Sequence, residues 1–294
     1  MKILLLGASG QLGWELQRSL APLGELLAPG RAEGADLGDP DRLEALARAL
    51  APDAIVNAAA YTAVDKAESE PALARLVNTE SVARLARVAK ERAALLLHYS
   101  TDYVFDGSGD GPRDETAATG PLSVYGRTKL EGEQAIQASG CRHLILRTSW
   151  VYAARGGNFA KTMLRLAAER EQLRVVNDQI GAPTGAELLA DGSAHALRQC
   201  LREPASGGLY HLAAQGSTSW ADYARFVIDE ARRQGQVLRC QEVVGIPSQD
   251  YPTPARRPLN SRLDCRRFEA DFGLRLPPWE PGVRRMIREC LGGL

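Results

Sequence analysis

The chain begins with a short apolar run, residues 2–6, that leads directly into a segment with regularly spaced glycines. A helix-like pattern follows over residues 12–20. Glycines in this spacing permit a tight turn, close approach of the backbone to a pyrophosphate and close packing of helix on strand. The first N–H groups of the helix also favour an anion. The segment predicts a dinucleotide-binding loop made by Gly7, Ser9, Gly10, Gln11, Leu12 and Gly13.

Short apolar runs and helical patterns continue to alternate through the first half of the chain. Strands that alternate with helices are typical of βαβ units and of a parallel sheet. The predicted fold class is therefore α/β, a Rossmann-like doubly wound parallel sheet with a smaller C-terminal α/β substrate domain. Strands are expected at residues 25–28, 53–58, 94–99 and 143–147, with helices opening at Pro40 and covering residues 71–92.

After about residue 176, prolines and glycines interrupt the pattern, and a second unit is expected there. Helices are still predicted over residues 186–201 and after Ser219, which stands in a capping-box spacing. Residues 208–213 alternate in polarity, which indicates a strand that returns to the first sheet. The expected dinucleotide-binding domain covers residues 1–176 and about 207–216, and the expected substrate domain covers about 177–206 and 217–294.

Composition narrows the classes of function. The 294 residues carry 36 basic and 36 acidic side chains, so nothing indicates a nucleic-acid partner or an anionic membrane surface. The five cysteines are scattered without a C-x-x-C pair, which favours reduced thiols over disulfides or zinc. The first apolar run is too short for a signal peptide or a spanning helix. We therefore expect a cytoplasmic protein.

The charge of the side chains after the second predicted strand indicates which dinucleotide is bound. An acidic side chain there would bind the ribose 2′-hydroxyl of NAD, whereas a basic one can pair with the 2′-phosphate of NADP. Arg31 follows this strand and favours NADP. Asp36 lies close enough to leave NAD use open, and Asp36 with Leu37 is expected to flank the adenine. Arg31 as a solvated loop residue is the alternative.

Tyr125 and Lys129 form a Tyr-x-x-x-Lys pattern. At this spacing the two side chains share one face of a helix, and a nearby ammonium lowers the pKa of a phenol. The pair predicts that Tyr125 donates or accepts a proton. Thr101 and Ser100 close the fourth strand, where a hydroxyl could bind a carbonyl at the cofactor crevice. An exposed helix face is the alternative for the pair alone.

The chain resembles the extended short-chain dehydrogenase/reductase family over nearly its whole length. The resemblance rests on MKILLLGASGQLGWEL at the start, NAAAYTAVDKAESEP at 57–71, STDYVFDG at 100–107, PLSVYGRTKLEGE at 121–133, RTSWVY at 147–152, VVNDQIGAPTGAELLAD at 175–191 and RRPLNSRLD at 256–264. It implies reduction by NADPH, with NADH use left open, of the 4-keto group of a dTDP-linked 6-deoxy-L-sugar. The implied product is dTDP-L-rhamnose.

The resemblance also implies roles for individual residues. Tyr125 would protonate the alkoxide that forms, Lys129 would tune Tyr125 and bind ribose, and Thr101 would orient the ketone. Residues that would line the cofactor are Asn57, Ala58, Ala59, Ala60, Tyr61 and Ser100, and residues that would approach the sugar are Thr62, Val64, Asp102, Tyr103 and Trp150. Residues 177–184 would receive the nucleotide, and a turn stabilised by Asp178 and Pro183 is the alternative. For Trp150 a buried aromatic behind the fifth strand is the alternative.

The same fold hosts several activities, so the fold alone does not distinguish a reductase from related proteins. A nucleotide-sugar 4,6-dehydratase needs an acid and a base beside the catalytic threonine, usually Asp-Glu, and this chain has Asp102-Tyr103. A C4 epimerase is disfavoured less firmly, by Arg31 and the segment around Thr101. A non-catalytic regulatory binder is also known in the family, and the presence of Thr101, Tyr125 and Lys129 makes it the minor interpretation.

Metal binding is left unassigned. In some family members carboxylates share Mg²⁺ at a dimer interface, and Glu15, Glu187 and Glu289 are carboxylates of that kind, although solvated helix faces explain them equally well. A magnesium-bridged homodimer therefore stays open. His98, His143, His195 and His211 have no ligand spacing, so core or surface roles are expected for them.

Overall fold

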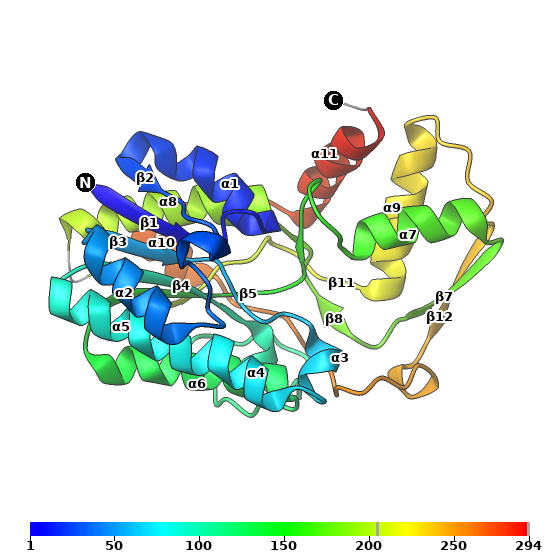
Figure 1. Ribbon diagram of the computed structural model, residues 1–294. Coiled ribbons are helices and arrows are strands. Elements are labelled where there is room, and N and C mark those ends of the chain that lie inside the picture. Colours follow the sequence, from blue (N-terminus) through cyan, green and yellow to red (C-terminus); the bar gives the residue numbers. More distant parts are fainter. Residues whose placement is uncertain (204–205, 293–294) are drawn as a thin grey trace.

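A single parallel sheet organises the first part of the molecule. The computed structural model describes residues 1–203 and 206–292. The sheet contains six strands in the order β10-β5-β4-β3-β1-β2, and every neighbouring pair is parallel (Figure 1). Its strands are β1 (Lys2–Leu6), β2 (Glu25–Leu27), β3 (Ala54–Asn57), β4 (Leu95–Thr101), β5 (Arg142–Thr148) and β10 (Gly208–His211). Strand order reverses between β1 and β3, which is where such sheets bind ligands.

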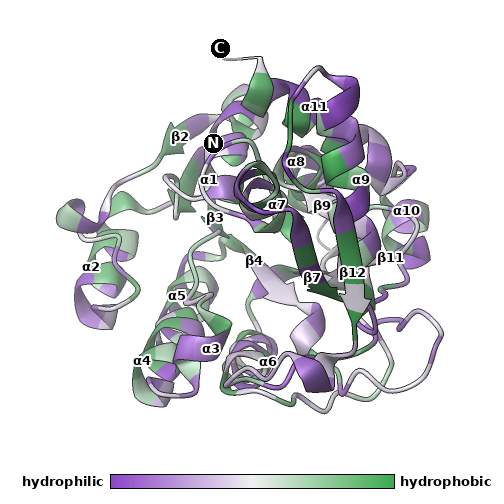
Figure 2. Cartoon of the chain, turned by 90° about the vertical axis from the view of Figure 1, so that its right-hand side faces the viewer, coloured by the Kyte–Doolittle hydropathy of each residue, from purple (hydrophilic) through white to green (hydrophobic). Residues whose placement is uncertain are grey.

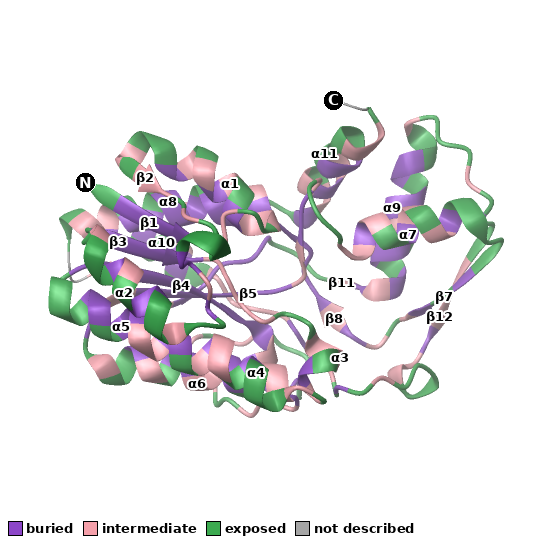
Figure 3. Cartoon of the chain, in the orientation of Figure 1, coloured by how far each residue is buried: buried purple, intermediate pink, exposed green. Residues whose placement is uncertain are grey.

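Helices cover both faces of the sheet, as the continuous apolar strands require. Successive strand residues point to opposite faces, so Ile3 and Leu5 enter one core while Leu4 and Leu6 enter the other. The central strands β3 and β4 are buried along their whole length, whereas the edge strand β2 is partly exposed (Figure 3). One face carries α1 (Gln11–Leu20), α8 (Ala186–Arg202) and α10 (Arg266–Phe272), and the other carries α2 (Pro40–Leu50), α5 (Ser81–Arg92) and α6 (Val124–Ser139).

A second unit with its own core stands beside the carboxyl ends of the strands (Figure 1). Its helices carry hydrophilic as well as hydrophobic residues (Figure 2), with Met163, Val227 and Met286 among those buried in its core. It consists of α7 (Phe159–Glu169), β7 (Gln172–Val176), α9 (Trp220–Arg233), β12 (Glu242–Ile246) and α11 (Trp279–Leu291). Two short strand pairs join the units: β6 (Val151–Tyr152) with β9 (Thr184–Gly185), and β8 (Ile180–Gly181) with β11 (Thr218–Ser219).

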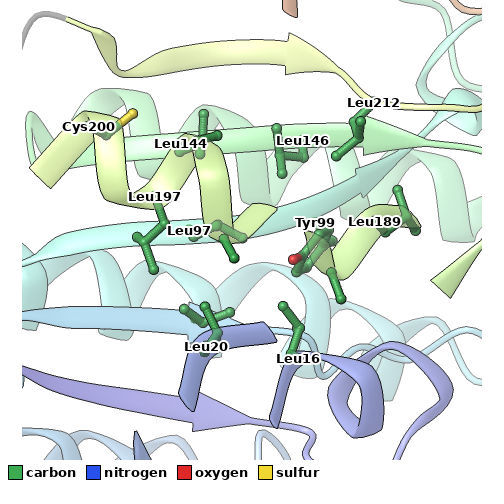
Figure 4. Packing of buried hydrophobic residues seen from close by; sticks show 14 of the residues in the cluster. Leu16, Leu20, Leu97, Tyr99, Leu144, Leu146, Leu189, Leu197, Cys200 and Leu212 are labelled. Carbon is green, nitrogen blue, oxygen red and sulfur yellow. The ribbon is translucent and has the colours of Figure 1, made fainter. Parts of the chain in front are cut away.

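The expected domain limits differ from the packing in two places. Residues 186–201 were expected in the substrate domain, but α8 packs on α1 and the sheet, where Leu189 and Leu197 meet Leu16 and Leu20 (Figure 4). Conversely, α7 and β7 contribute to the second core. An amphipathic helix pattern specifies a buried face but not the sheet that it covers. Residues 204–205 and 293–294, which those limits include, lie outside the described residues.

Two other expectations, a strand that returns to the first sheet and a helix cap at Ser219, are confirmed. Residues 208–211 form β10, which returns to the first sheet beside β5. Ser219 caps α9 by accepting a hydrogen bond from the Asp222 N–H. All five cysteines are free thiols. Among the residues that the structure describes, no helix combines the length and the apolar character needed to cross a bilayer.

The helix expected over residues 71–92 is interrupted. It divides into α4 (Pro71–Arg75), a π-helical turn (Leu76–Glu80) and α5, and a short helix, α3 (Val64–Ala67), precedes it. A π turn inserts one extra residue and rotates the backbone locally, often at a functional site. Here it turns the buried Asn78 toward α6. Gly132 of α6 permits this contact, because a β-carbon there would lie 2.3 Å from the Asn78 carbonyl oxygen.

Candidate active site

The glycine loop joins β1 to α1 at the point where strand order reverses. Gly7 has φ of +78°, and a β-carbon on it would lie 2.7 Å from the Ala59 nitrogen. A β-carbon on Gly13 would lie 1.9 Å from the Gly7 carbonyl oxygen. Gly10 precedes α1, and no side chain caps the helix. The first-turn N–H groups can therefore bind an anion, and the three glycines let the backbone approach a pyrophosphate closely.

The other predicted loop residues lie around this cradle. Ser9 is exposed at the turn, and Leu12 packs against the core below it. Gln11 Oε1 accepts a hydrogen bond from Asn158 Nδ2 over 3.1 Å. Because Asn158 caps α7 of the second unit, this bond ties the loop to the opposite wall of the site.

Arg31, Asp36 and Leu37 follow β2 at the edge of the sheet. Arg31 is exposed in a short 3₁₀ turn, and within the described ranges its guanidinium makes no ion pair. Asp36 Oδ1 accepts a hydrogen bond from the Gly38 N–H over 2.9 Å, whereas Leu37 is buried. A cation is thus available beside the place where an adenosine ribose would lie, and the nearby carboxylate is engaged by the backbone.

Residues 57–61 leave β3 directly opposite the glycine loop. The Ala58 N–H donates to the Leu6 carbonyl over 3.1 Å, and the Ala59 N–H donates to Asn57 Oδ1 over 3.2 Å. Asn78 holds the far end of the segment, since its amide bonds both the N–H and the carbonyl of Tyr61. Ala60 lies between these anchors. The segment is fixed by hydrogen bonds at both ends, which presents its backbone in one conformation.

The three predicted catalytic residues come from β4 and α6. Thr101 is the last residue of β4 and Ser100 precedes it; both are buried. Ser123 caps α6 by accepting a hydrogen bond from the Gly126 N–H over 3.2 Å. This cap sets Tyr125 in the first turn and Lys129 one turn later, with Lys129 only 2% exposed. The hydroxyl, the phenol and the amine therefore come together at the carboxyl end of the sheet.

The electrostatics of Tyr125 differ from the expectation. Desolvation raises the pKa of Tyr125 to about 12, although a hydrogen bond with Thr101 opposes the rise. The expected lowering by Lys129 is wrong for this structure, because Lys129 Nζ donates to the Tyr99 carbonyl oxygen over 2.6 Å instead of facing the phenol. Burial lowers the pKa of Lys129 to about 8, with Glu133 opposing. Tyr125 is thus a protonated phenol at neutral pH.

The predicted sugar-side residues divide into two groups. Tyr103 lies edge-on to Tyr125, with ring centroids 5.6 Å apart and an interplanar angle of 77°. Asp102 is buried next to Thr101, and burial raises its pKa to about 6. Thr62 and Val64 lie at the start of α3, with Thr62 exposed. The phenol of Tyr125 is therefore bordered by an aromatic ring and a carboxyl group from the same short turn.

Trp150 lies on the opposite side, between the two units. Its backbone has φ of +48°, a strained conformation for a bulky residue, and its indole stacks on Trp220 with centroids 3.5 Å apart. A β-carbon on Gly181 would lie 2.7 Å from this indole. The alternative of an aromatic buried behind β5 is wrong, because Trp150 is partly exposed and belongs to the aromatic cluster of the second unit.

The loop over residues 177–184 is held by the second unit. Asp178 accepts hydrogen bonds from the N–H and the hydroxyl of Ser248, and Gln179 bonds both Ser248 and the Trp220 indole N–H. Its polar side chains therefore brace the loop. Arg257 forms a bidentate ion pair with Asp65 of α3, with its closer contact at 2.6 Å.

The three carboxylates considered for a metal lie near one another on α1, α8 and α11. Burial, followed by repulsion from Glu187, raises the pKa of Glu15. Glu187 forms an ion pair with Arg285, with the closest nitrogen and oxygen atoms 2.7 Å apart. The Arg285 guanidinium also lies 3.8 Å from the Glu289 carboxylate. Over the ranges 1–203 and 206–292, no group of three candidate ligands is arranged to hold a metal ion.

Sequence reasoning missed three residues that shape the site. Asn78 fixes the segment after β3, Arg257 bridges to α3, and His98 lies against Lys129. His98 was expected only in a core or surface role. No local pattern marks these positions, because each acts through a contact with an element distant in the sequence.

These features together define an extended short-chain dehydrogenase/reductase: a glycine cradle at the switch point, a hydroxyl ending β4, and Tyr and Lys one helical turn apart. The chain belongs to the family described as RmlD substrate binding domain, whose model matches residues 1–291. It is 58% identical over 292 residues to a dTDP-4-dehydrorhamnose reductase of Salmonella typhimurium, with 98% of both chains covered.

Solved structures agree with this assignment. A dTDP-4-dehydrorhamnose reductase of Clostridium acetobutylicum matches with a TM-score of 0.88 at 33% identity, covering 98% of each chain. One from Bacillus anthracis, in complex with NADP, matches with a TM-score of 0.87 at 31% identity, covering 98% of this chain and 99% of that one. The fold and the family are therefore shown by sequence and by structure.

Proposed function

We propose that this protein uses NADPH to reduce the 4-keto group of dTDP-4-dehydro-6-deoxy-L-mannose, giving dTDP-L-rhamnose. Relatives named dTDP-4-dehydrorhamnose reductase match nearly the full chain, and they support this reaction. The observation that carries the proposal is the grouping of Thr101, Tyr125 and Lys129 beside the glycine cradle. This grouping combines a dinucleotide cradle with a proton donor, which are the two parts that ketone reduction requires.

The cofactor would lie across the carboxyl ends of β1, β3 and β4. The glycine loop would hold the pyrophosphate, Arg31 the 2′-phosphate, and residues 57–61 the remaining length of the dinucleotide. Lys129 would bind the nicotinamide ribose hydroxyls, and Ser100 lies beside them. When bound, NADPH supplies the hydride that adds to C4 of the sugar. The complex of the Bacillus anthracis relative with NADP supports the binding of this type of cofactor.

Tyr125 is the proposed proton donor to the sugar oxygen. Its raised pKa keeps the phenol protonated at neutral pH, which is the form that a reductase needs at the start of each turnover. Thr101, with its hydroxyl beside Tyr125, would orient the ketone oxygen. Thr62, Val64, Tyr103 and Trp150 would enclose the sugar.

The neighbours of Thr101 favour reduction over dehydration. A 4,6-dehydratase removes water with an acid and a base, usually Asp-Glu, after the threonine. Position 103 here is a tyrosine whose ring packs edge-on against Tyr125, and burial raises its pKa further. No base is available at that position. We also propose a cytoplasmic location, which the five free cysteines support.

The proposal is tested by following NADPH absorbance with a substrate generated in place. A dTDP-glucose 4,6-dehydratase and a 3,5-epimerase would supply the keto sugar, and NADPH loss should require both enzymes. NADPH loss with the dehydratase alone would indicate a different keto sugar as substrate. NADPH binding without turnover would instead favour the regulatory binder.

A further inference from the structure

His98 lies buried between β3 and α6, next to the proposed catalytic lysine. Its side chain is 0% exposed, and each ring nitrogen lies against one polar partner. Nδ1 lies 3.1 Å from Asn57 Nδ2, and Nε2 lies 3.2 Å from Lys129 Nζ. Asn57 and His98 are register partners on adjacent strands, which holds their side chains on the same face of the sheet.

The direction of these hydrogen bonds follows from a neighbouring backbone group. The Ala59 N–H can only donate, and it donates to Asn57 Oδ1 over 3.2 Å. The other end of the amide, Nδ2, therefore faces His98 Nδ1 and must donate to it. A neutral imidazole that accepts at Nδ1 carries its proton on Nε2. With the amide in this orientation, Asn57 and, through it, the Ala59 N–H favour the Nε2–H tautomer of His98.

This tautomer conflicts with a charged Lys129. The Nε2–H of His98 points at Lys129 Nζ, and an ammonium has no lone pair with which to accept it. A neutral amine does have one, and it can still donate to the Tyr99 carbonyl. The charged amine requires the other tautomer, with Nδ1–H donating to a reversed Asn57 amide. After that reversal, Asn57 Nδ2 faces the Ala59 N–H, and two donors meet without an acceptor. This arrangement is unfavourable in a buried network.

We propose that His98, oriented by Asn57, is a positioning residue that couples the charge on Lys129 to the hydrogen bond made by the Ala59 backbone. In the uncharged state His98 is the Nε2–H tautomer and the Ala59 N–H is paired. Uptake of one proton converts Lys129 to the ammonium, moves the imidazole proton to Nδ1 and reverses the Asn57 amide. Burial lowers the pKa of Lys129 to about 8, which places this proton uptake in an accessible pH range.

Other charged groups near Lys129 do not supply an equivalent switch. Glu133, one turn further along α6, attracts the ammonium, but its carboxylate is held by Arg147 of β5 at 2.6 Å. From the end of β4, Asp102 faces Tyr125. His98 itself stays neutral, because burial and the nearby Lys129 hold its pKa well below the usual value. Its tautomer, not its charge, is therefore the variable that changes.

The coupling has a consequence for the cofactor site. Ala59 lies against Gly7, where an added β-carbon would be 2.7 Å from the Ala59 nitrogen. The proton on Lys129 and the backbone beside the glycine cradle thus share one hydrogen-bond network. The role of this network in cofactor binding rests on the proposed reductase function, in which Lys129 binds ribose and the cradle binds pyrophosphate. The hydrogen-bond network itself is present without cofactor.

The test is ¹⁵N NMR of the histidine rings in the resting protein at pH 6.5 and pH 9.5. The chain has four histidines, and His98→Gln identifies the His98 signals by their loss. We expect the Nδ1–H tautomer at pH 6.5 and the Nε2–H tautomer at pH 9.5, with a midpoint near 8. One unchanged tautomer at both pH values, or a charged imidazolium at pH 6.5, would overturn the proposal.

Two variants separate the coupling from a purely structural role. Lys129→Met removes the titrating amine and should leave His98 as Nε2–H at both pH values. Asn57→Asp supplies an acceptor to Nδ1 and should fix Nδ1–H at both. A pH-dependent switch that persists in Lys129→Met contradicts the assignment. Because no turnover is measured, the result can be interpreted even if the proposed reductase activity is absent.

Discussion

Thr101 Oγ1 donates a hydrogen bond to Asp102 Oδ1 over 3.1 Å, and both side chains are buried at the carboxyl end of β4. The Thr101 hydroxyl has one proton, so a bond to the carboxylate competes with a bond to a ketone. When Asp102 is protonated it can donate to Thr101, and the hydroxyl proton becomes available to the substrate. The protonation of Asp102 therefore bears on the oxygen that the proposed mechanism uses.

The buried Asp102 should make stability depend on pH. Its folded pKa of about 6 lies above the ordinary 3.8, so between these values the folded state binds more protons than the unfolded state. Stability is therefore lost as pH rises through this window, by about 3 kcal/mol in total. Asp102→Asn lacks this loss. Between pH 4 and pH 7, the free energy of unfolding measured in urea should rise in Asp102→Asn relative to the wild type. Parallel pH dependences of the two free energies would refute the assignment.

Gly13→Ala should abolish NADPH binding and weaken the fold. A β-carbon at this position would lie 1.9 Å from the Gly7 carbonyl oxygen, so the loop and α1 must separate. Gly111→Ala is a matched control, since an added β-carbon there meets nothing within 4 Å. Fluorescence titration with NADPH measures both variants. Wild-type affinity in Gly13→Ala would show that the close loop–helix contact is not needed.

Arg31→Ala should raise the KM for NADPH by roughly 10–100-fold and leave the KM for NADH unchanged. The reason is the loss of charge-assisted hydrogen bonds to the 2′-phosphate, worth about 1.5–3 kcal/mol. Arg198→Ala removes another exposed arginine and serves as the control. Steady-state kinetics with each cofactor provide the comparison. An equal effect on both cofactors would remove Arg31 from cofactor discrimination.

Removal of one partner of the Arg147–Glu133 ion pair should destabilise the fold. Both side chains are buried, with Nη2 of Arg147 2.6 Å from Glu133 Oε2. Arg147→Met leaves an unpaired buried carboxylate and should destabilise the fold by about 3–5 kcal/mol. Adding Glu133→Leu should recover part of the loss. Chemical denaturation of the single and double variants measures this, and equal losses in both would contradict the explanation.

Local pattern was sufficient for much of the fold. The spacing of Gly7, Gly10 and Gly13 after an apolar run predicted the loop, and alternating segments predicted the parallel sheet. The Tyr125–Lys129 spacing put both residues on one helix, as observed. These features depend on residues close in sequence, so sequence reasoning could identify them.

Features that depend on distant contacts were not predictable in the same way. The π turn at Asn78 exists because its amide bonds Tyr61 and Thr128, which lie on other elements. Lys129 was expected to face Tyr125, but the Tyr99 carbonyl captures its amine. The position of α8 on the sheet likewise depends on which apolar surface was left uncovered.

The most direct test of the proposed reductase is the turnover number of Tyr125→Phe, measured by NADPH oxidation with the keto sugar. Loss of the proton donor should reduce kcat by about 10²–10⁴-fold while NADPH binding is retained. Tyr223→Phe is the matched control, because its buried hydroxyl has no hydrogen-bond partner within the described ranges. A kcat for Tyr125→Phe close to that of the wild type would contradict the account.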